Sequence, residues 1–455
     1  MSGSTRPLNR GSAARVSRAG GDGTAMKIVH IVPGTGGTFY CQNCLRDMAL
    51  IGALRRRGHD VLVVPMYLPV RLDETELSTD TPIFFGGINV YLQQKFGLFR
   101  HTPRWLDHVL DARWILRRAA KREGSTDPAS LGDMTLSMLR GRHGHQGKEL
   151  DRLTAWLAEH EQPDVVHLSN SLLIGLAQAL RERLGVPICC TLQDEDTWLD
   201  AMEPKYSRLC WDAMAARDPD VAAYIVVSDW YARQMHDRMG VADDRLHRVH
   251  IGLDLSAFEA AMLPFEPPVI GYLSRLGKAQ GLEQLVDAFI TIKAHPQLKQ
   301  VKLRATGGIT ALDRAFVAHL REKLRAAGIL EDVEFLEHFG DADRRAFLQS
   351  VSVLSVPVPE GEAFGTYIIE ALASGVPVVE PNVGAFPELV KATGGGRIYD
   401  QANPAGLAEA LTALLLDPEG ATALGARGRE AVLERFTADA MAERVEKVYA
   451  SVVSA

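Results

Sequence analysis

Residues 359–379 read PEGEAFGTYIIEALASGVPVV and form the most informative stretch of the chain. A β-rich run ends before it, a short loop carries Glu362, and a helical run begins close to Gly365. A second acid, Glu370, follows eight positions after the first. A strand, a loop and a helix followed by another β-rich run make up the repeating unit of a parallel α/β sheet. The stretch therefore predicts two carboxylates around the N-terminus of a helix, at the end of a sheet strand.

A helix N-terminus in this setting predicts a site for negative charge. The backbone N–H groups of Phe364, Gly365 and Thr366 would have no intrahelical partners, and the helix dipole favours an anion such as a diphosphate there. Glu370 would then accept hydrogen bonds from the hydroxyls of a ribose, and Glu362 from those of a sugar. Taken alone, such a pair is more often a solvated loop acid and a helix surface residue.

The same strand and helix alternation runs through both halves of the chain. It begins with MKIVHIVPGTGG at 26–37 and DVLVVP at 60–65, and it starts afresh with VIGYLS at 269–274. Three prolines, at 264, 267 and 268, separate the two series. We therefore predict an α/β fold of two Rossmann-like, doubly wound domains facing a cleft. The predicted parts are a tail at 1–25, an N-terminal domain at 26–264 with an insertion at 67–162, a C-terminal domain at 265–435 and a last helix at 436–455.

Length, charge and hydrophobicity limit the classes of function that the chain can have. A chain of 455 residues is too long for one hydrophobic core, and a net charge of -7 argues against a nucleic-acid partner. There is no apolar run long enough to span a bilayer, and residues 1–25 lack a secretory core, so we expect a cytoplasmic protein with a disordered tail. A transit peptide is the alternative for this basic leader. Residues 105–122, WLDHVLDARWILRRAAKR, combine apolar and basic side chains and could contact a membrane surface, although packing on their own domain is the commoner outcome.

The chain has five cysteines, an odd number that fits a reducing compartment better than a disulfide framework. Cys41 and Cys44 form a CxxC pair. A zinc site would need a second ligand pair at the right spacing, and none is evident, so we interpret the two cysteines as structural. Redox chemistry is the alternative.

Several segments together resemble the retaining GT-B glycosyltransferases of family four, the glycosyl transferases group 1. Their C-terminal domain carries two glutamates separated by seven residues in an EGFG…EAMACG-PVV pattern, which stands here as EAFGTYIIEALASGVPVV at 362–379. The resemblance extends over nearly everything from Met26 onward, through PGTGG, RRRGHDVLVV, PDVVHLS, VSDWYARQM, GLDLSAF, GYLSRLGKAQGLEQLVDAF and GAFPELV. It implies that the helix at 436–455 returns to the N-terminal domain.

The resemblance also implies donor-binding residues after the first strand of the C-terminal domain. Arg275 occupies the place of an arginine that grips the donor phosphates, and a guanidinium suits that task because it binds two oxygens at once. Where the family carries a lysine directly before a glycine, this chain has Gln280 before Gly281. Lys278, two residues earlier, would supply the cation instead.

On the N-terminal side, Gly36 and Gly37 resemble the glycine loop where donor and acceptor meet, and their missing side chains let the backbone approach a ligand. Phe39 replaces the third glycine of a dinucleotide fingerprint, which disfavours an NAD-linked oxidoreductase. Gln193 stands where the family often has a histidine, so we expect Gln193, Asp194 and Asp196 to orient acceptor hydroxyls. The Asp-x-Asp pattern occurs three times in the chain, as chance allows, so we expect no metal and no other cofactor.

We therefore expect a metal-independent enzyme that moves a hexose-type sugar from a nucleoside diphosphate to a hydroxyl of a saccharide, lipid or small molecule, with retained configuration. Arg275 and Glu362 are the predicted catalytic residues. Two other classes remain open: a module that binds sugar nucleotides without turnover, and a sugar-nucleotide epimerase or phosphorolytic enzyme on the same scaffold. His59, His167 and His250 each end or flank a strand and are expected to be structural.

Overall fold

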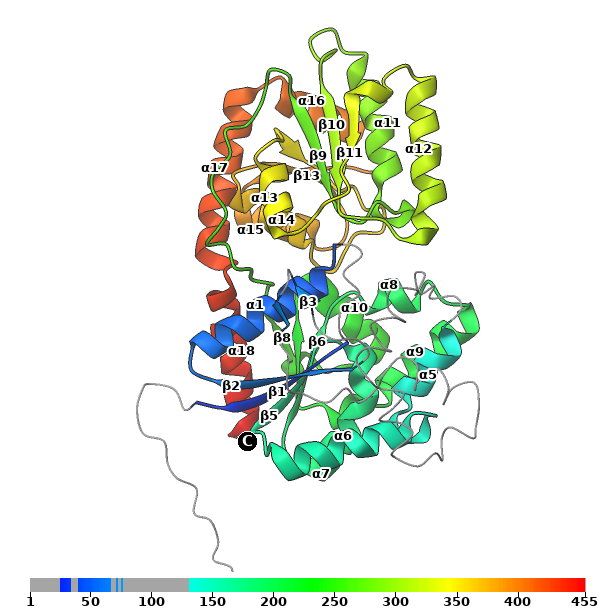
Figure 1. Ribbon diagram of the computed structural model, residues 1–455, viewed down its shortest axis with the longest axis vertical. Coiled ribbons are helices and arrows are strands. Elements are labelled where there is room, and N and C mark those ends of the chain that lie inside the picture. Colours follow the sequence, from blue (N-terminus) through cyan, green and yellow to red (C-terminus); the bar gives the residue numbers. More distant parts are fainter. Residues whose placement is uncertain (1–24, 34–39, 67–70, 73–74, 77–130, 455) are drawn as a thin grey trace, which may run out of the picture.

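Two six-stranded parallel sheets, one in each half of the chain, organise the molecule (Figure 1). The computed structural model describes residues 25–33, 40–66, 71–72, 75–76 and 131–454. The first sheet has the strand order β2-β1-β5-β6-β7-β8 and the second β11-β10-β9-β12-β13-β14. Strand order reverses beside β1 and beside β9, and in open α/β sheets ligands bind at such switch points, outside the carboxyl ends of the strands. The predicted fold class is therefore confirmed.

The inner strands of the N-terminal sheet, β5, β6 and β7, are short runs whose residues are all buried, as expected for a parallel sheet covered on both faces. β1 pairs with β2 and β5, so that Ile28 lies beside Val61 and Val165. Its strands are β1 Lys27–Val32, β2 Asp60–Pro65, β5 Val165–Leu168, β6 Ile188–Leu192, β7 Ala223–Val226 and β8 Leu246–Arg248. Its helices are α1 Gln42–Arg56, α5 Gly132–Leu139, α6 Gly147–His160, α7 Ala177–Leu184, α8 Glu195–Leu199, α9 Pro204–Ala215 and α10 Asp229–Met239.

The C-terminal sheet repeats this construction. In α11, for example, apolar residues recur at helical spacing and lie buried against the sheet, namely Leu282, Leu285, Val286 and Phe289. The strands are β9 Val269–Leu273, β10 Lys302–Thr306, β11 Val333–Phe335, β12 Val353–Leu354, β13 Val378–Pro381 and β14 Gly396–Tyr399. The helices are α11 Leu282–Lys293, α12 Arg314–Ala326, α13 Asp341–Leu348, α14 Thr366–Ala373, α15 Phe386–Thr393, α16 Gly406–Leu415 and α17 Pro418–Arg435.

The chain crosses between the two sheets twice. The first crossing runs from the end of β8 to β9 and contains the three prolines. The second follows α17 and leads into α18 Ala438–Val453, which packs with α1 against the N-terminal sheet (Figure 1). Backbone hydrogen bonds join the crossings, with Leu253 N donating to Phe436 O at 3.0 Å and Ala438 N to Leu253 O at 2.8 Å. The two crossings therefore form one hydrogen-bonded connection between the halves.

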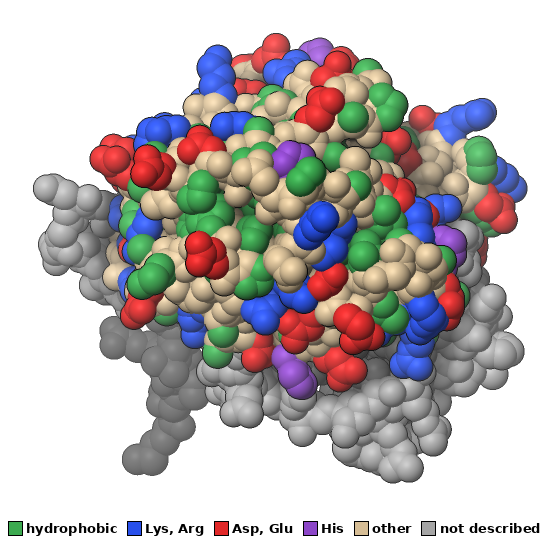
Figure 2. All heavy atoms as spheres, turned by 90° about the horizontal axis from the view of Figure 1, so that it is seen from above, with side chains coloured by type: hydrophobic (Ala, Val, Ile, Leu, Met, Phe, Trp, Pro, Cys, Tyr) green, Lys and Arg blue, Asp and Glu red, His purple; other side chains and the backbone are tan. Residues whose placement is uncertain are grey.

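Part of the predicted insertion lies within the described residues, as α5 and α6, which pack into the N-terminal domain. A short antiparallel pair, β3 Arg71–Leu72 and β4 Thr75–Glu76, precedes them. The tail at 1–24 and the predicted membrane-surface segment at 105–122 lie outside the described residues. None of the described helices is long and apolar enough to cross a membrane. Seen from above, the C-terminal domain mixes acidic and basic side chains over its surface, as a solvated face does (Figure 2).

Candidate active site

The sequence predicted an anion site at the N-terminus of α14. In the structure, the side chain of Gln42 from the N-terminal domain binds there. Gly365 caps the helix at φ 103°, a conformation that a residue with a Cβ rarely adopts. The amide of Thr366 donates a hydrogen bond of 2.6 Å to Gln42 Oε1, and Gln42 Nε2 donates one of 2.8 Å to Glu362 Oε2. One amide group therefore joins the helix terminus to the loop carboxylate.

Both carboxylate oxygens of Glu370 are also engaged, and the residue is 1% exposed. Oε2 accepts a hydrogen bond of 2.7 Å from the Tyr40 hydroxyl, and Oε1 one of 2.9 Å from Arg344 Nε. Burial alone would lower the pKa of Arg344, but the adjacent charge of Glu370 outweighs it and raises that pKa. Tyr40 N also donates to Gly307 O at 2.9 Å, so the start of α1 is docked on the C-terminal domain.

Glu362 is half-buried, and burial raises its pKa to about 7, even though the hydrogen bond from Gln42 acts in the opposite direction. Asp194 faces it across the domain interface. Burial, followed by the charge of Glu362, raises the pKa of Asp194 well above its usual range, while a backbone hydrogen bond from Ala363 lowers it. Asp194 also has a positive φ of 60°, an uncommon backbone conformation that clusters at functional sites. Two acids with raised pKa values thus meet at the carboxyl ends of the two sheets.

Arg275 follows β9 and forms a paired contact with Asp313. Its Nε and one terminal nitrogen each lie 2.9 Å from an oxygen of that carboxylate, and a third of the arginine side chain stays exposed. Burial would raise the pKa of Asp313, but the hydrogen bonds from Arg275 outweigh it and lower that pKa. Lys278 is exposed on the next turn, and the Gln280 side chain folds back beside Gly277. Asp313 therefore holds in place the Arg275 guanidinium, which we predicted to bind the donor phosphates.

Tyr272 connects this turn to the rest of the site. Its hydroxyl donates to the carbonyl of Arg275 at 2.9 Å, and burial followed by the charge of Glu362 raises the pKa of this tyrosine. Phe364, by contrast, points into the domain interface, where its ring lies 6.0 Å from that of His250. Its predicted part in donor binding concerned only its backbone N–H.

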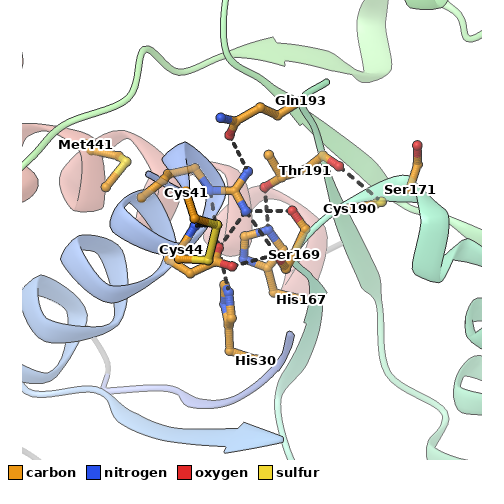
Figure 3. Close-up of polar contacts among 12 residues, drawn as sticks. His30, Cys41, Cys44, His167, Ser169, Ser171, Cys190, Thr191, Gln193 and Met441 are labelled. Atoms are coloured by element: carbon orange, nitrogen blue, oxygen red, sulfur yellow. Dashed lines mark hydrogen bonds and ion pairs between the residues drawn. A yellow bond between two sulfur atoms is a disulfide. The ribbon is translucent and has the colours of Figure 1, made fainter. Parts of the chain in front are cut away.

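Gln193 directly follows β6 and belongs to a buried polar network in the N-terminal domain (Figure 3). Its Oε1 accepts a hydrogen bond of 2.9 Å from Arg46, while its Nε2 has no hydrogen-bond partner among the described residues. Arg46 also pairs with Asp47, whose pKa burial would raise but the arginine charge lowers. Asp196, the third predicted acceptor residue, receives a hydrogen bond of 3.1 Å from the Tyr231 hydroxyl.

Cys41 and Cys44, which we interpreted from the sequence as structural rather than as zinc ligands, form a disulfide (Figure 3). The bond closes the first turn of α1, where Cys41 is the N-cap residue and its sulfur accepts the amide of Cys44 at 3.3 Å. The odd number of cysteines argued only against a framework of several disulfides. It does not exclude a single local disulfide within a CxxC pair. The other three cysteines are buried and free.

Glu388 at the start of α15 binds the N-terminal domain on another side of the interface. Its carboxylate accepts hydrogen bonds of 2.9 and 3.1 Å from the amide of Asp229 and one of 3.3 Å from that of Trp230, at the N-terminus of α10. His250 Nε2 lies 2.8 Å from it. The Ser228 hydroxyl adds a bond of 2.7 Å to the carbonyl of Ala363. These contacts close the domains on each other.

The sequence predicted Arg275 and the two glutamates of the C-terminal domain, but not Tyr40, Gln42 and Arg344, which bind the glutamates. No local pattern marks these residues. Gly36 and Gly37 lie outside the described residues. The three histidines expected to be structural bond to protein groups, namely His59 to Glu446, His167 to Thr191 and His250 to Glu388. Among the described residues, no three His, Cys, Asp or Glu side chains gather where they could hold a metal ion.

Comparison with known families agrees with this geometry. The family described as Glycosyl transferases group 1 matches residues 257–431, and Glycosyltransferase Family 4 matches residues 134–257. The two matches meet at residue 257 and together span residues 134–431, which comprise most of the C-terminal domain and part of the N-terminal domain.

The chain belongs to the group 1 glycosyltransferases.

Two relatives of this glycosyltransferase are named for different inositol compounds. It is 34% identical over 135 residues to a phosphatidyl-myo-inositol mannosyltransferase of Mycobacterium leprae, a match over 29% of this chain and 36% of that protein. It is 31% identical over 187 residues to a D-inositol 3-phosphate glycosyltransferase of Corynebacterium diphtheriae, covering 41% and 43% of the two chains. Each match thus spans less than half of the relative.

Solved structures confirm the GT-B fold. Sucrose-phosphate synthase from Thermosynechococcus elongatus superposes with a TM-score of 0.67 at 19% identity, covering 94% of this glycosyltransferase and 99% of that chain. HepE from Anabaena, solved with UDP-glucose, gives a TM-score of 0.64 at 16% identity over 94% and 100% of the two chains.

Proposed function

We propose that this glycosyltransferase moves a hexose-type sugar from a nucleoside diphosphate to a hydroxyl acceptor, with retained configuration and without a metal ion. The donor would bind in the C-terminal domain between Arg275, the start of α14 and the two glutamates. The acceptor would approach from the ends of the N-terminal strands, near Gln193 and the acids that follow it.

The observation that carries this proposal is the way in which Tyr40 and Gln42 engage the C-terminal domain. The Tyr40 hydroxyl donates to Glu370, the carbonyl oxygen of Gln42 accepts the Thr366 amide, and the Gln42 amide group donates to Glu362. A sugar nucleotide presents the same three functions in the same order: a ribose hydroxyl, a phosphate oxygen and a sugar hydroxyl. The two side chains thus make the contacts that we propose for the donor.

The proposed reaction breaks the bond between the anomeric carbon and the diphosphate oxygen and forms one to the acceptor oxygen. The departing phosphate oxygen, on the same face of the sugar, takes the acceptor proton, so no separate base is required. Arg275 and the helix N-terminus would stabilise the negative charge that develops on the leaving group, as a metal ion does elsewhere. Asp313 supports this role because it fixes the plane of the guanidinium.

Two substitutions test the proposal. Arg275→Ala is expected to lower kcat about 100-fold or more, since losing one transition-state contact to developing charge typically costs that much. Glu370→Ala is expected to weaken the binding of UDP or GDP about tenfold, because a hydrogen bond to a charged group is lost. Transfer would be followed with UDP- and GDP-hexoses and a panel of hydroxyl acceptors, with chelator present.

Arg304→Ala is the matched control, because Arg304 lies on β10 and pairs with Glu334 on the neighbouring strand. Its kinetics should match those of the wild type. Unchanged kinetics for both test variants would end the proposal. Nucleotide binding without transfer or slow donor hydrolysis would instead identify a binding module, and a changed donor sugar without acceptor would identify an epimerase.

A further inference from the structure

The disulfide between Cys41 and Cys44 is placed for redox chemistry rather than for stapling the fold. It links residues three apart and so closes no long loop, whose constraint is what gives structural disulfides most of their effect. Both cysteines are half-buried at the N-terminus of α1, a position that favours the thiolate form once the bond is reduced. In a reducing compartment such a disulfide is transient, and it forms and is reduced again as part of catalysis or redox sensing.

The remaining three cysteines do not share these properties. Cys189, Cys190 and Cys210 are fully buried. Burial raises the pKa of Cys189 to about 12 and that of Cys210 to about 11, and it raises the pKa of Cys190 well above its usual range. Buried thiols with raised pKa values react slowly, because the thiolate is the reactive form. Redox chemistry in this chain is therefore confined to the CxxC pair.

Cys41 lies between the two residues that fill the donor site. Tyr40 before it binds Glu370 and the carbonyl of Gly307, and Gln42 after it bridges Glu362 and the amide of Thr366. We define residues 40–42 as the cap. Its two contacting side chains lie on either side of a residue whose own side chain is bonded to Cys44 in the first turn of α1. A change in that bond therefore acts at the backbone from which both cap side chains project.

We propose that Cys41–Cys44 is a thiol–disulfide exchange site for dithiol reductants, and that its oxidation state controls whether the cap occupies the donor site. In the oxidised form, which the structure represents, the first turn is closed and the cap is seated. Reduction would open the turn, free Tyr40 and Gln42 from the carboxylates and the helix terminus, and admit the donor. The donor-site part rests on the proposed function.

The exchange balances as a two-electron reduction. A thiolate of the reductant attacks one sulfur of the disulfide, the S–S bond breaks, and a mixed disulfide forms with the other sulfur released as a thiolate. The second thiol of the reductant then attacks the mixed disulfide and leaves as part of an oxidised cyclic or protein disulfide. Cys41 and Cys44 end as two thiols, with the two protons supplied by the reductant. The same site would oxidise again by the reverse exchange.

The first experiment compares oxidised protein with protein reduced by dithiothreitol, the state of each sample being read by mass and by a maleimide gel shift. UDP and GDP are titrated into both. We expect the reduced form to bind nucleotide about tenfold more tightly, a coupling within the usual range. Cys41→Ser/Cys44→Ser should behave like reduced protein whether or not dithiothreitol is present. Cys210→Ala, the matched control, should keep the full response. Equal affinity in the two wild-type forms, with nucleotide bound, would overturn the proposal.

A second measurement separates this proposal from the donor assignment. Hydrogen exchange is followed, without ligand, in a peptide containing Thr366, whose amide is protected by Gln42 when the cap is seated. We expect faster exchange after reduction, and Gln42→Ala should give fast exchange in both redox states. If exchange responds to reduction but no nucleotide binds, the redox-controlled cap stands and the donor assignment fails. If exchange is the same in both states, the proposal is wrong, whatever the nucleotide does.

Discussion

At the scale of single residues, Glu362 is the group whose ionisation can be followed. Its pKa in the folded protein is about 7, raised from 4.5 because burial disfavours the charged form. Its contribution to stability is therefore complete below about pH 4.5 and is lost as the pH rises through 7. We predict that the stability of the wild type relative to Glu362→Gln falls over this window, by at most about 1.4 kcal/mol per pH unit, and is constant above it.

Thermal unfolding at pH 5, 6, 7 and 8 measures this difference. Gln keeps the size of the side chain and an acceptor for Gln42 but removes the titration. Glu334→Gln is the control, since Glu334 lies on β11 with half its side chain exposed. Unfolding midpoints that stay a constant distance apart for Glu362→Gln and the wild type would contradict the raised pKa.

The residues of the site divide by how far their partners lie along the chain. Glu362, Gly365 and Glu370 were predictable, because a strand, a loop and a helix N-terminus within twenty residues define them. Tyr40 lies 330 residues from its partner Glu370, and Gln42 lies 324 from Thr366. No spacing rule reaches across two domains, so these contacts of Tyr40 and Gln42 were not predictable from the sequence.

At the scale of elements, apolar periodicity predicted the long helices, because each buries one face on its own sheet, and short β-rich apolar runs predicted the strands. The placement of α18 on the N-terminal domain came only from family resemblance. Nothing in its sequence tells which of two similar sheets it covers. Tyr449 explains in part why α18 covers the N-terminal sheet. Its hydroxyl lies 2.6 Å from Nδ1 of His167, which belongs to the buried polar network shown in Figure 3.

We predict that Tyr449→Phe destabilises the protein by about 1–3 kcal/mol, because it leaves a buried ring nitrogen of His167 without its partner. Chemical unfolding with a signal from the N-terminal domain measures the loss. Tyr206→Phe is the matched control, since the Tyr206 hydroxyl forms no hydrogen bond within the part of the chain that the structure describes. Equal stability of the two variants would mean that this hydrogen bond does not help to anchor α18.

At the scale of the whole molecule, two connections join the domains and a set of side-chain contacts closes them on each other. The crossings are joined through Leu253, Phe436 and Ala438 and are suited to act as a hinge. The closing contacts are the cap, the Ser228 bond to Ala363 and the clamp around Glu388. Under the proposal above the cap competes with the donor, whereas Glu388 contacts Asp229, Trp230 and His250. Its clamp can therefore hold the domains closed in either state.

This separation gives the last prediction. Glu388→Ala removes the acceptor of the Asp229 and Trp230 amides and of His250, and losing hydrogen bonds to a charged group costs about 2–3 kcal/mol. The ratio of closed to open protein should fall by a factor of tens. Small-angle scattering would detect this as a larger radius of gyration, and kinetic measurements would detect it as a lower kcat/KM.

The same clamp predicts a pH dependence. Burial would raise the pKa of Glu388, but the hydrogen bond from His250 outweighs burial and lowers that pKa. Wild-type closure is therefore retained above about pH 4.5 and lost only as the pH falls further. Glu434→Ala, on an exposed face of α17, should leave both measurements unchanged. A Glu388→Ala protein as compact as the wild type would show that the cap and Ser228 alone close the cleft.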